Sequence, residues 1–283
     1  MNICIAGLGL IGGSFAKAIS KRTNHVCMGL DTNEDSCKKA LKEGAISQVI
    51  TPQQLSVADL LILALQPKTL VSFFKNNAQY LKKGAIVFDT CGVKKAILDE
   101  VLPVAQQYGI NFVGVHPMAG REFSGYDYSL ENLFDKASFI VTTDGADQKA
   151  TEVVCELAKQ IGFAVITVTN ADHHDRVIAY TSQLAHIVSN SYCKSDTINQ
   201  KEGFCAGSFA DMTRVGKLDV KLWTELFLAN PDHLGDELGN LIQKLTEFKI
   251  AIDNKDEKTL SQLLKEGNDI KVQSLQNEQK QKA

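Results

Sequence analysis

One histidine stands out as a candidate proton acceptor. It is His116, which opens the run His-Pro-Met-Ala-Gly at 116–120, directly after the apolar segment 111–115. The proline that follows favours an extended backbone at the histidine, and the small residues leave space beside the ring. An imidazole suits a base that works near neutral pH. A histidine at a strand end can equally have a structural role, in which its ring forms hydrogen bonds with the backbone of a turn. This run alone therefore leaves both interpretations open.

A glycine-rich loop lies near the start of the chain. Gly7, Gly9 and Gly12 match G-x-G-x-x-G between an apolar strand pattern and a helix pattern. In such loops the first glycine allows a tight turn, the second admits a pyrophosphate and the third lets helix pack on strand. The N–H groups that start the helix attract phosphate. A turn without a ligand is the alternative, but we expect dinucleotide binding by Gly7, Leu8, Gly9, Leu10, Ile11 and Gly12.

An acidic residue follows the second expected strand. Asp31 comes directly after 26–30 and 19 residues after Gly12. A carboxylate there accepts hydrogen bonds from the adenosine ribose and repels a 2′-phosphate. Thr32 and Asn33 come next, with no arginine to bind that extra phosphate. The sequence therefore predicts NAD as the cofactor, although it does not fix how strictly NADP is rejected.

Strand and helix patterns alternate up to residue 169, and only helix patterns follow. Apolar strands separated by helices predict a parallel sheet covered on both faces. We expect an α/β fold, with a Rossmann-type dinucleotide-binding domain at 1–169 and an all-helical domain for substrate and dimerisation at 170–283. The last dozen residues, rich in Gln, Lys and Asn, should fray. The expected strands are 2–6, 26–30, 60–65, 85–89, 111–115, 138–142 and 164–168, and the expected helices are 12–21, 35–43, 69–80, 94–108, 151–161, 171–192, 221–228 and 231–252.

Composition excludes several classes of protein. The 283 residues carry a net charge of −3 with 22% charged and 44% hydrophobic residues, which argues against nucleic acid or a membrane as a partner. Seven scattered cysteines without C-x-x-C favour a reducing compartment and no metal site. The longest apolar run, 60–65, is too short for a bilayer, and no signal peptide is evident. We expect a cytoplasmic protein.

Three further segments carry reactive side chains. The run 89–94, Asp-Thr-Cys-Gly-Val-Lys, follows a strand at the edge of the sheet where ligands gather. Ser182 and His186 share one helix face at i and i+4. Arg214 is one of only four arginines, so few arginine side chains are available to bind an anionic substrate.

Together these runs make the chain resemble the prephenate dehydrogenase family in its short monofunctional form. The resemblance implies NAD-dependent oxidative decarboxylation of prephenate to 4-hydroxyphenylpyruvate, in tyrosine biosynthesis. It also implies a homodimer formed through the helical domain, with 203–211 reaching towards the partner's site. It rests on G-L-G-L-I-G-G-S at 7–14, D-x-x-G-V-K at 89–94, H-P-M-A-G-R-E-x-S-G at 116–125, H-D at 174–175, T-S-x-L-x-H at 181–186 and D-M-T-R at 211–214.

The resemblance also implies roles for individual residues. His116 is the catalytic base, and Arg214 binds the ring carboxylate as a planar fork. His186 lies near the substrate side chain, although packing between domains is its alternative. The remaining substrate-binding candidates, each with a structural or solvated alternative, are Glu122, Ser124, Arg121 and Gln183.

Some positions depart from the family's pattern. Gly92 stands where many relatives carry a serine, and the hydroxyl of Thr90 is the nearest candidate to replace it. Gln183 and Ala210 stand where relatives often have a histidine and a basic residue. These departures leave open the choice between prephenate and arogenate, which differ in one keto or amino group. The sequence is also compatible with a β-hydroxyacid dehydrogenase and with a module that binds NAD without turnover, and it does not reveal tyrosine inhibition.

Overall fold

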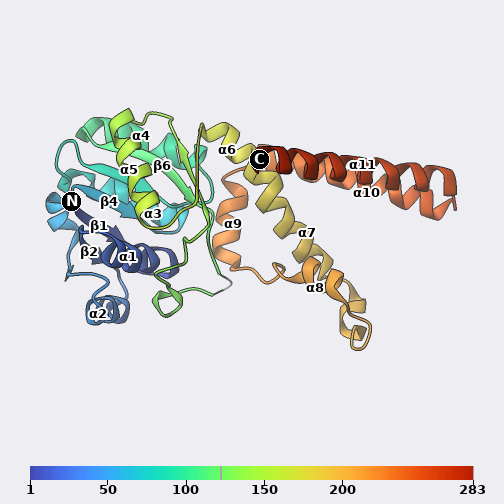
Figure 1. Cartoon of the computed structure of the whole chain (residues 1–283), viewed down its shortest axis with the longest axis horizontal. Helices are drawn as coiled ribbons and strands as arrows, with labels where there is room; N and C mark the ends of the chain where they lie inside the picture. Colours follow the sequence, from blue (N-terminus) through green and yellow to red (C-terminus); the bar gives the residue numbers. More distant parts are fainter. Residues whose placement is uncertain (122, 283) are drawn as a thin grey trace. The chain divides into compact units, whose positions relative to one another are not determined.

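The computed structural model describes residues 1–121 and 123–282. The chain divides into two compact units, Met1–His233 and Leu234–Ala283. The first unit holds a mixed sheet, the helices that cover it and a further group of helices (Figure 1). The second unit is a hairpin of two long helices.

The described residues form a sheet of eight strands in the order β3-β2-β1-β4-β5-β6-β7-β8. From β3 to β6 every neighbouring pair is parallel, and β1 lies at the centre of the dinucleotide-binding arrangement. The strands are β1 Asn2–Ala6, β2 Val26–Leu30, β3 Gln48–Val49, β4 Leu60–Leu63, β5 Ile86–Asp89, β6 Asn111–Pro117, β7 Ser138–Thr142 and β8 Val165–Thr169.

Helices cover both faces of the sheet because its central strands are apolar on both sides. Alternate residues of β1 point into different cores: Ile3 and Ile5 meet α1 and α5, whereas Cys4 and Ala6 belong to the core beneath α3 and α4. The helices are α1 Leu10–Arg22, α2 Glu34–Lys42, α3 Pro67–Asn77, α4 Lys95–Tyr108, α5 Gln148–Gln160, α6 Ala171–Ile178, α7 Ala185–Tyr192, α8 Gly207–Thr213, α9 Val220–Leu228, α10 Pro231–Asp253 and α11 Glu257–Lys282.

The expectation of a wholly parallel sheet is wrong at one edge. β7 runs antiparallel to β6, and β8 runs parallel to β7. A parallel pair needs a long crossover, usually a helix, whereas an antiparallel pair does not. The connection 118–137 carries only the short 3-10 turn Tyr126–Tyr128 among its described residues, so β7 returns beside β6 in the opposite direction.

The helical region after β8 differs from expectation in two details. The segment 171–192 is one continuous run, as expected, but a π-helical turn at Ala179–Leu184 separates α6 from α7. Helix α11 continues to Lys282, through the described part of the segment that was expected to fray. Its Lys, Gln and Glu residues are good helix formers, and pairs such as Lys265–Asp269 add i,i+4 attraction.

A buried ion pair joins the edge of the sheet to the first turn of α4. Asp89 ends β5, Lys94 precedes α4, and both side chains are fully buried. Their charges bond each other and the main chain of Val115: the Val115 N–H donates to Asp89 Oδ1 over 3.1 Å, and Lys94 Nζ donates to the Val115 carbonyl over 2.5 Å. The pair therefore fixes the end of β6, just before His116.

Removing one partner of this pair should destabilise the fold strongly. We expect Lys94→Met to lower the free energy of unfolding by about 3–5 kcal/mol, because it leaves the Asp89 carboxylate buried and unpaired. Lys95→Met is the matched control, since the neighbouring lysine is 59% exposed and pairs only with Asp99 on the surface. Urea unfolding should move this control by less than about 0.5 kcal/mol. Equal losses in the two variants would contradict the role of the buried pair.

Candidate active site

The glycine loop has the shape that a pyrophosphate requires. Gly7 has a φ of +90°, and a Cβ there would lie 2.4 Å from the carbonyl oxygen of Ala64. A Cβ on Gly12 would lie 1.8 Å from the carbonyl oxygen of Gly7, so only glycine lets α1 approach the loop so closely. At Gly9, in contrast, a Cβ would meet no described atom within 4 Å. The open space at the middle glycine fits a bound phosphate group.

Asp31 lies beside this loop at the end of β2. Its Oδ2 accepts a hydrogen bond from the Leu8 N–H over 2.6 Å, and its Oδ1 accepts one from the Asn33 N–H over 2.7 Å. Each carboxylate oxygen can accept a second hydrogen bond, so the ribose hydroxyls of a dinucleotide have acceptors here. The side chain of Asn33 is itself engaged, because it caps the start of α2.

His116 lies at the carboxyl end of β6, where the buried Asp89–Lys94 pair holds the preceding residue. Its Nε2 faces the space above Gly92: a Cβ on that glycine would be 3.7 Å from Nε2 and 3.6 Å from Leu226 Cδ2. Within the described part of the chain, Nε2 has no hydrogen-bond partner. A proton acceptor is thus available towards the space that Gly92 leaves.

The other ring nitrogen of His116 has a partner that sequence reasoning missed. His116 Nδ1 lies 2.9 Å from Nε2 of His174, and His174 Nδ1 lies 2.7 Å from Oδ1 of Asp175. The sequence alone predicts a capping or packing role for His174 near the junction of the two expected domains. The capping role belongs to Asp175, which accepts the N–H groups of Lys94 and Lys95 at the start of α4. The H-D pair at 174–175 was the only signal, and nothing local ties it to His116.

Burial keeps both imidazoles neutral. It lowers the pKa of His116 well below the ordinary value of 6.5, and the neighbouring His174 and Lys94 lower it further. Burial also lowers the pKa of His174, although the hydrogen bond to Asp175 opposes that shift. A neutral His116 is in the state that a general base needs before it accepts a proton.

A second cluster contains His186, Trp223 and Arg214. The rings of His186 and Trp223 lie against each other, with centroids 3.8 Å apart and their planes tilted by 30°. Burial and the positive charge of Arg214 both lower the pKa of His186, while its hydrogen bond to the Ser182 carbonyl raises it. Helix α9 joins this cluster to the first one, because it carries both Trp223 and Leu226.

The other predicted substrate residues lie in different settings. Arg121 and Ser124 are exposed on the loop after β6, and Arg121 donates to the Tyr128 carbonyl over 3.4 Å. Glu122 lies outside the described residues. Gln183 is buried, and its amide bonds the Leu226 carbonyl and the side chain of Asn230. Among the described residues, Arg121, Ser124 and Gln183 make no hydrogen bond with His116.

Thr90 does not replace the serine hydroxyl that is absent at Gly92. Its Oγ1 donates to the carbonyl of Leu63 on β4, over 3.4 Å. The space between Gly92 and His116 Nε2 is therefore not filled by that hydroxyl. A substrate group can enter it instead.

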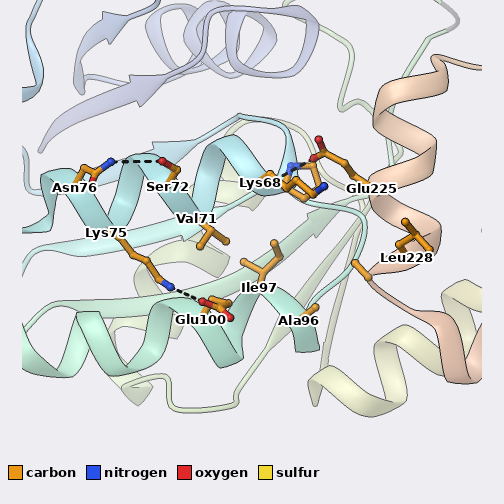
Figure 2. Close-up of a pocket in the computed structure, with 12 residues that line it drawn as sticks. Lys68, Val71, Ser72, Lys75, Asn76, Ala96, Ile97, Glu100, Glu225 and Leu228 are labelled. Atoms are coloured by element: carbon orange, nitrogen blue, oxygen red, sulfur yellow. Dashed lines mark hydrogen bonds and ion pairs between the residues drawn. The ribbon is translucent and has the colours of Figure 1, made fainter.

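A hollow of about 540 Å³ lies between α3, α4 and α9, away from these clusters. Figure 2 shows its apolar floor, made by side chains such as Val71 and Ile97, and the Lys75–Glu100 ion pair beside it. Glu225 accepts a hydrogen bond from the Lys68 N–H, which caps the start of α3. The predicted site residues that the structure describes do not line this hollow.

The described residues contain no group of three or more His, Cys, Asp or Glu side chains that could hold a metal ion. Over the same residues, no helix combines the length and apolar character that crossing a membrane requires.

Comparison with family models decides the family. Residues 15–167 match the prephenate dehydrogenase nucleotide-binding domain, and residues 170–266 match the prephenate dehydrogenase dimerization domain. The chain belongs to the prephenate dehydrogenase family. The junction of the two matches falls between residues 167 and 170, where β8 gives way to α6.

Individual members of this family resemble the chain over nearly its full length. The prephenate dehydrogenase of Lactococcus lactis is 29% identical over 280 residues, which cover 95% of this chain and 76% of the relative. A structure of Aquifex aeolicus prephenate dehydrogenase with hydroxyphenyl propionate and NAD+ has a TM-score of 0.83 at 27% identity and covers 98% of each chain. The structure of Synechocystis arogenate dehydrogenase has a TM-score of 0.81 at 26% identity and covers 97% of this chain and 100% of that one.

Because His116 and His174 are buried, the folded state of this dehydrogenase should lose stability in mild acid. Their pKa values are lower in the folded state than the unfolded value of 6.5, so the stability they contribute is complete above about pH 6.5 and is lost as the pH falls below it. Each contributes a slope of about 1.4 kcal/mol per pH unit in that window. In urea unfolding, His174→Gln should reduce the slope, whereas the exposed control His173→Asn should retain it. Identical slopes in the two variants would refute this account.

Proposed function

We propose that this chain oxidises prephenate with NAD and releases carbon dioxide and 4-hydroxyphenylpyruvate. The observation that carries the proposal is the unpaired Nε2 of neutral His116, at the sheet edge that also presents the dinucleotide loop. The complex of the Aquifex aeolicus enzyme with NAD+ and a hydroxyphenyl acid supports it, because the fold matches over the full chain.

In this reaction the chain's own residues bind, orient and accept a proton. NAD supplies the hydride acceptor when it is bound, and the glycine loop with Asp31 holds it. His116 Nε2 takes the proton of the substrate hydroxyl as hydride leaves the same ring carbon. The electron pair of the bond to the departing carboxylate then enters the ring, which becomes aromatic as carbon dioxide leaves. The phenolate oxygen takes the proton back from His116 Nε2, which regenerates the neutral base. The loop contacts we assign to the cofactor are those of Gly7, Leu8, Gly9, Leu10, Ile11 and Gly12.

We assign the substrate carboxylate to Arg214 and the substrate side chain to His186. Support comes from the proximity of these two groups and from the contact of the His186 ring with the Trp223 ring, which holds the imidazole in place. Arg121, Glu122 and Ser124 stay candidates on the loop that follows β6. For Gln183 we propose a structural role instead, since both ends of its amide are engaged inside the protein.

Arogenate is the second candidate substrate, because the Synechocystis arogenate dehydrogenase has the same fold over its entire chain. Prephenate and arogenate differ only in the keto or amino group on the side chain that we assign to His186, and an imidazole can form a hydrogen bond with either group. We propose that the two domains have the functions expected from the sequence. Residues 1–169 bind the dinucleotide, and residues 170–283 contribute to the substrate site and to dimerisation.

Turnover should depend on His116. NADH absorbance on mixing enzyme, NAD and substrate should rise with prephenate, and the same assay with arogenate measures the alternative. His116→Asn should lower kcat by about 10²–10⁴-fold because the base is lost, while NAD binding, measured by calorimetry, stays the same. His173→Asn, on the surface, is the control. Full activity in the His116 variant would disprove the proposed mechanism, and no NADH with either substrate would disprove the function.

We also propose that two copies of the chain associate through the unit Leu234–Ala283. In this unit α10 and α11 lie side by side as a hairpin (Figure 1), which is too small to bury its own apolar side chains. A match to a dimerization domain covers most of it. The large apolar side chains left more than 40% exposed there are Ile242, Leu245, Ile250, Ile252, Leu264, Ile270, Val272 and Leu275.

In sedimentation equilibrium, the protein should have twice the 30.9 kDa mass of one chain. Joint replacement of Ile242 and Ile252 by Asp should shift it to the single-chain mass, because charges would then occupy the apolar contact. Gln243→Asp adds a charge at a neighbouring polar position and is the control. A single-chain mass for the unmodified protein would rule the dimer out.

A further inference from the structure

Two imidazoles and a carboxylate form a chain of hydrogen bonds behind the proposed base. The order is His116 Nδ1, His174 Nε2, His174 Nδ1 and Asp175 Oδ1, with distances of 2.9 Å and 2.7 Å. The two rings meet edge to face, at 66°. Each of these hydrogen bonds holds one proton, so the position of one proton determines the position of the next.

Asp175 sets the direction of this chain because its carboxylate only accepts hydrogen bonds. Besides His174, it accepts the N–H groups of Lys94 and Lys95, each over 2.8 Å. These groups open α4, where the helix end carries a partial positive charge that attracts the carboxylate. The side chain of Asp175 is almost fully buried, so water does not compete for its oxygens.

The remaining protons follow by elimination. His174 must carry a proton on Nδ1 to donate to Asp175, and a neutral ring then has only a lone pair on Nε2. That lone pair must accept a proton from His116, which therefore sits on Nδ1. We infer that Asp175, acting through His174, fixes His116 in the tautomer whose bare Nε2 lone pair points into the space above Gly92.

This inference rests on the proposed role of His116 as the base, and it gives His174 and Asp175 positioning roles in the same reaction. The O–H bond of the substrate breaks, and the N–H bond forms on His116 Nε2. The ring becomes an imidazolium that keeps its Nδ1–H on His174. Burial and the nearby charge of Lys94 oppose this imidazolium, whereas the acceptor chain that ends in Asp175 stabilises it.

Asp175→Asn should remove the negative charge at the end of this hydrogen-bond chain without breaking the chain. Asp175 Oδ1 accepts both the His174 Nδ1–H and the Lys94 N–H, so the amide oxygen takes that position and the NH2 group turns towards the Lys95 N–H. His116 keeps its bare Nε2, but the imidazolium that forms during the reaction loses the charge that stabilises it. We expect kcat to fall by about 10²–10⁴-fold, while the KM values for NAD and substrate change by less than about threefold.

Two replacements of His174 separate positioning from packing. Gln reaches as far as the histidine Nε2 and offers an oxygen that can accept the His116 proton, whereas Asn is too short to reach it. His174→Gln should therefore retain at least about ten times the kcat of His174→Asn. The KM values and the NAD-binding capacity per chain should match in these two variants. His173→Gln and His173→Asn are the surface controls and should both behave as the unmodified enzyme.

The tautomer itself can be read without turnover. In the full-length enzyme with ¹⁵N-labelled histidine, the His116 signals are those absent from His116→Asn. Nε2 should show the ¹⁵N shift of a bare ring nitrogen in the unmodified enzyme and in Asp175→Asn. A protonated Nε2 in the unmodified enzyme, or equal kcat in both His174 variants, would overturn the inference. Absence of turnover with either substrate would overturn the proposed function alone, since the ¹⁵N result does not depend on it.

Discussion

The active edge of the sheet depends on the burial of one opposite-charge pair. Asp89 and Lys94 have no access to water, so their remaining hydrogen-bonding capacity must be met inside the protein. The main chain of Val115 meets part of it, because its N–H bonds the carboxylate and its carbonyl bonds the ammonium. Strand pairing between β5 and β6 stops at Val113, so these side chains hold β6 where the backbone ladder no longer does.

The Asp89–Lys94 pair also connects the sheet to α4, the helix that follows Lys94. Lys94 uses its side chain to hold Val115 and its own N–H to bind Asp175 on α6. From Asp175 the hydrogen bonds run through His174 to His116, which is bonded covalently to Val115. The result is a closed ring of interactions that joins β5, β6, α4 and α6. It gives a physical reason why the helices up to residue 233 form one compact unit with the sheet.

Local sequence rules predicted the parts of the site that local geometry determines. The strands Asn2–Ala6, Val26–Leu30 and Ser138–Thr142 have the expected bounds. The glycine loop has the expected shape, because a tight turn and a close backbone approach require glycine, and the sequence shows glycine there. The direction of β7 cannot be predicted in this way, since side chains alternate between the two faces of the sheet in parallel and in antiparallel strands alike. The contact of His116 with His174 joins residues 58 apart, and no local pattern records it.

Gly92 shows how the two kinds of information complement each other. From sequence, Gly92 suggests that a functional hydroxyl is missing, because many relatives carry a serine at this position. In the structure, the orientation of His116 comes from the opposite side of the ring, through Nδ1 and His174. The histidine therefore does not need a hydroxyl at position 92 to fix its orientation. The other side of the ring, where Nε2 lies near Gly92 and Leu226, is where we propose that the substrate hydroxyl meets the base.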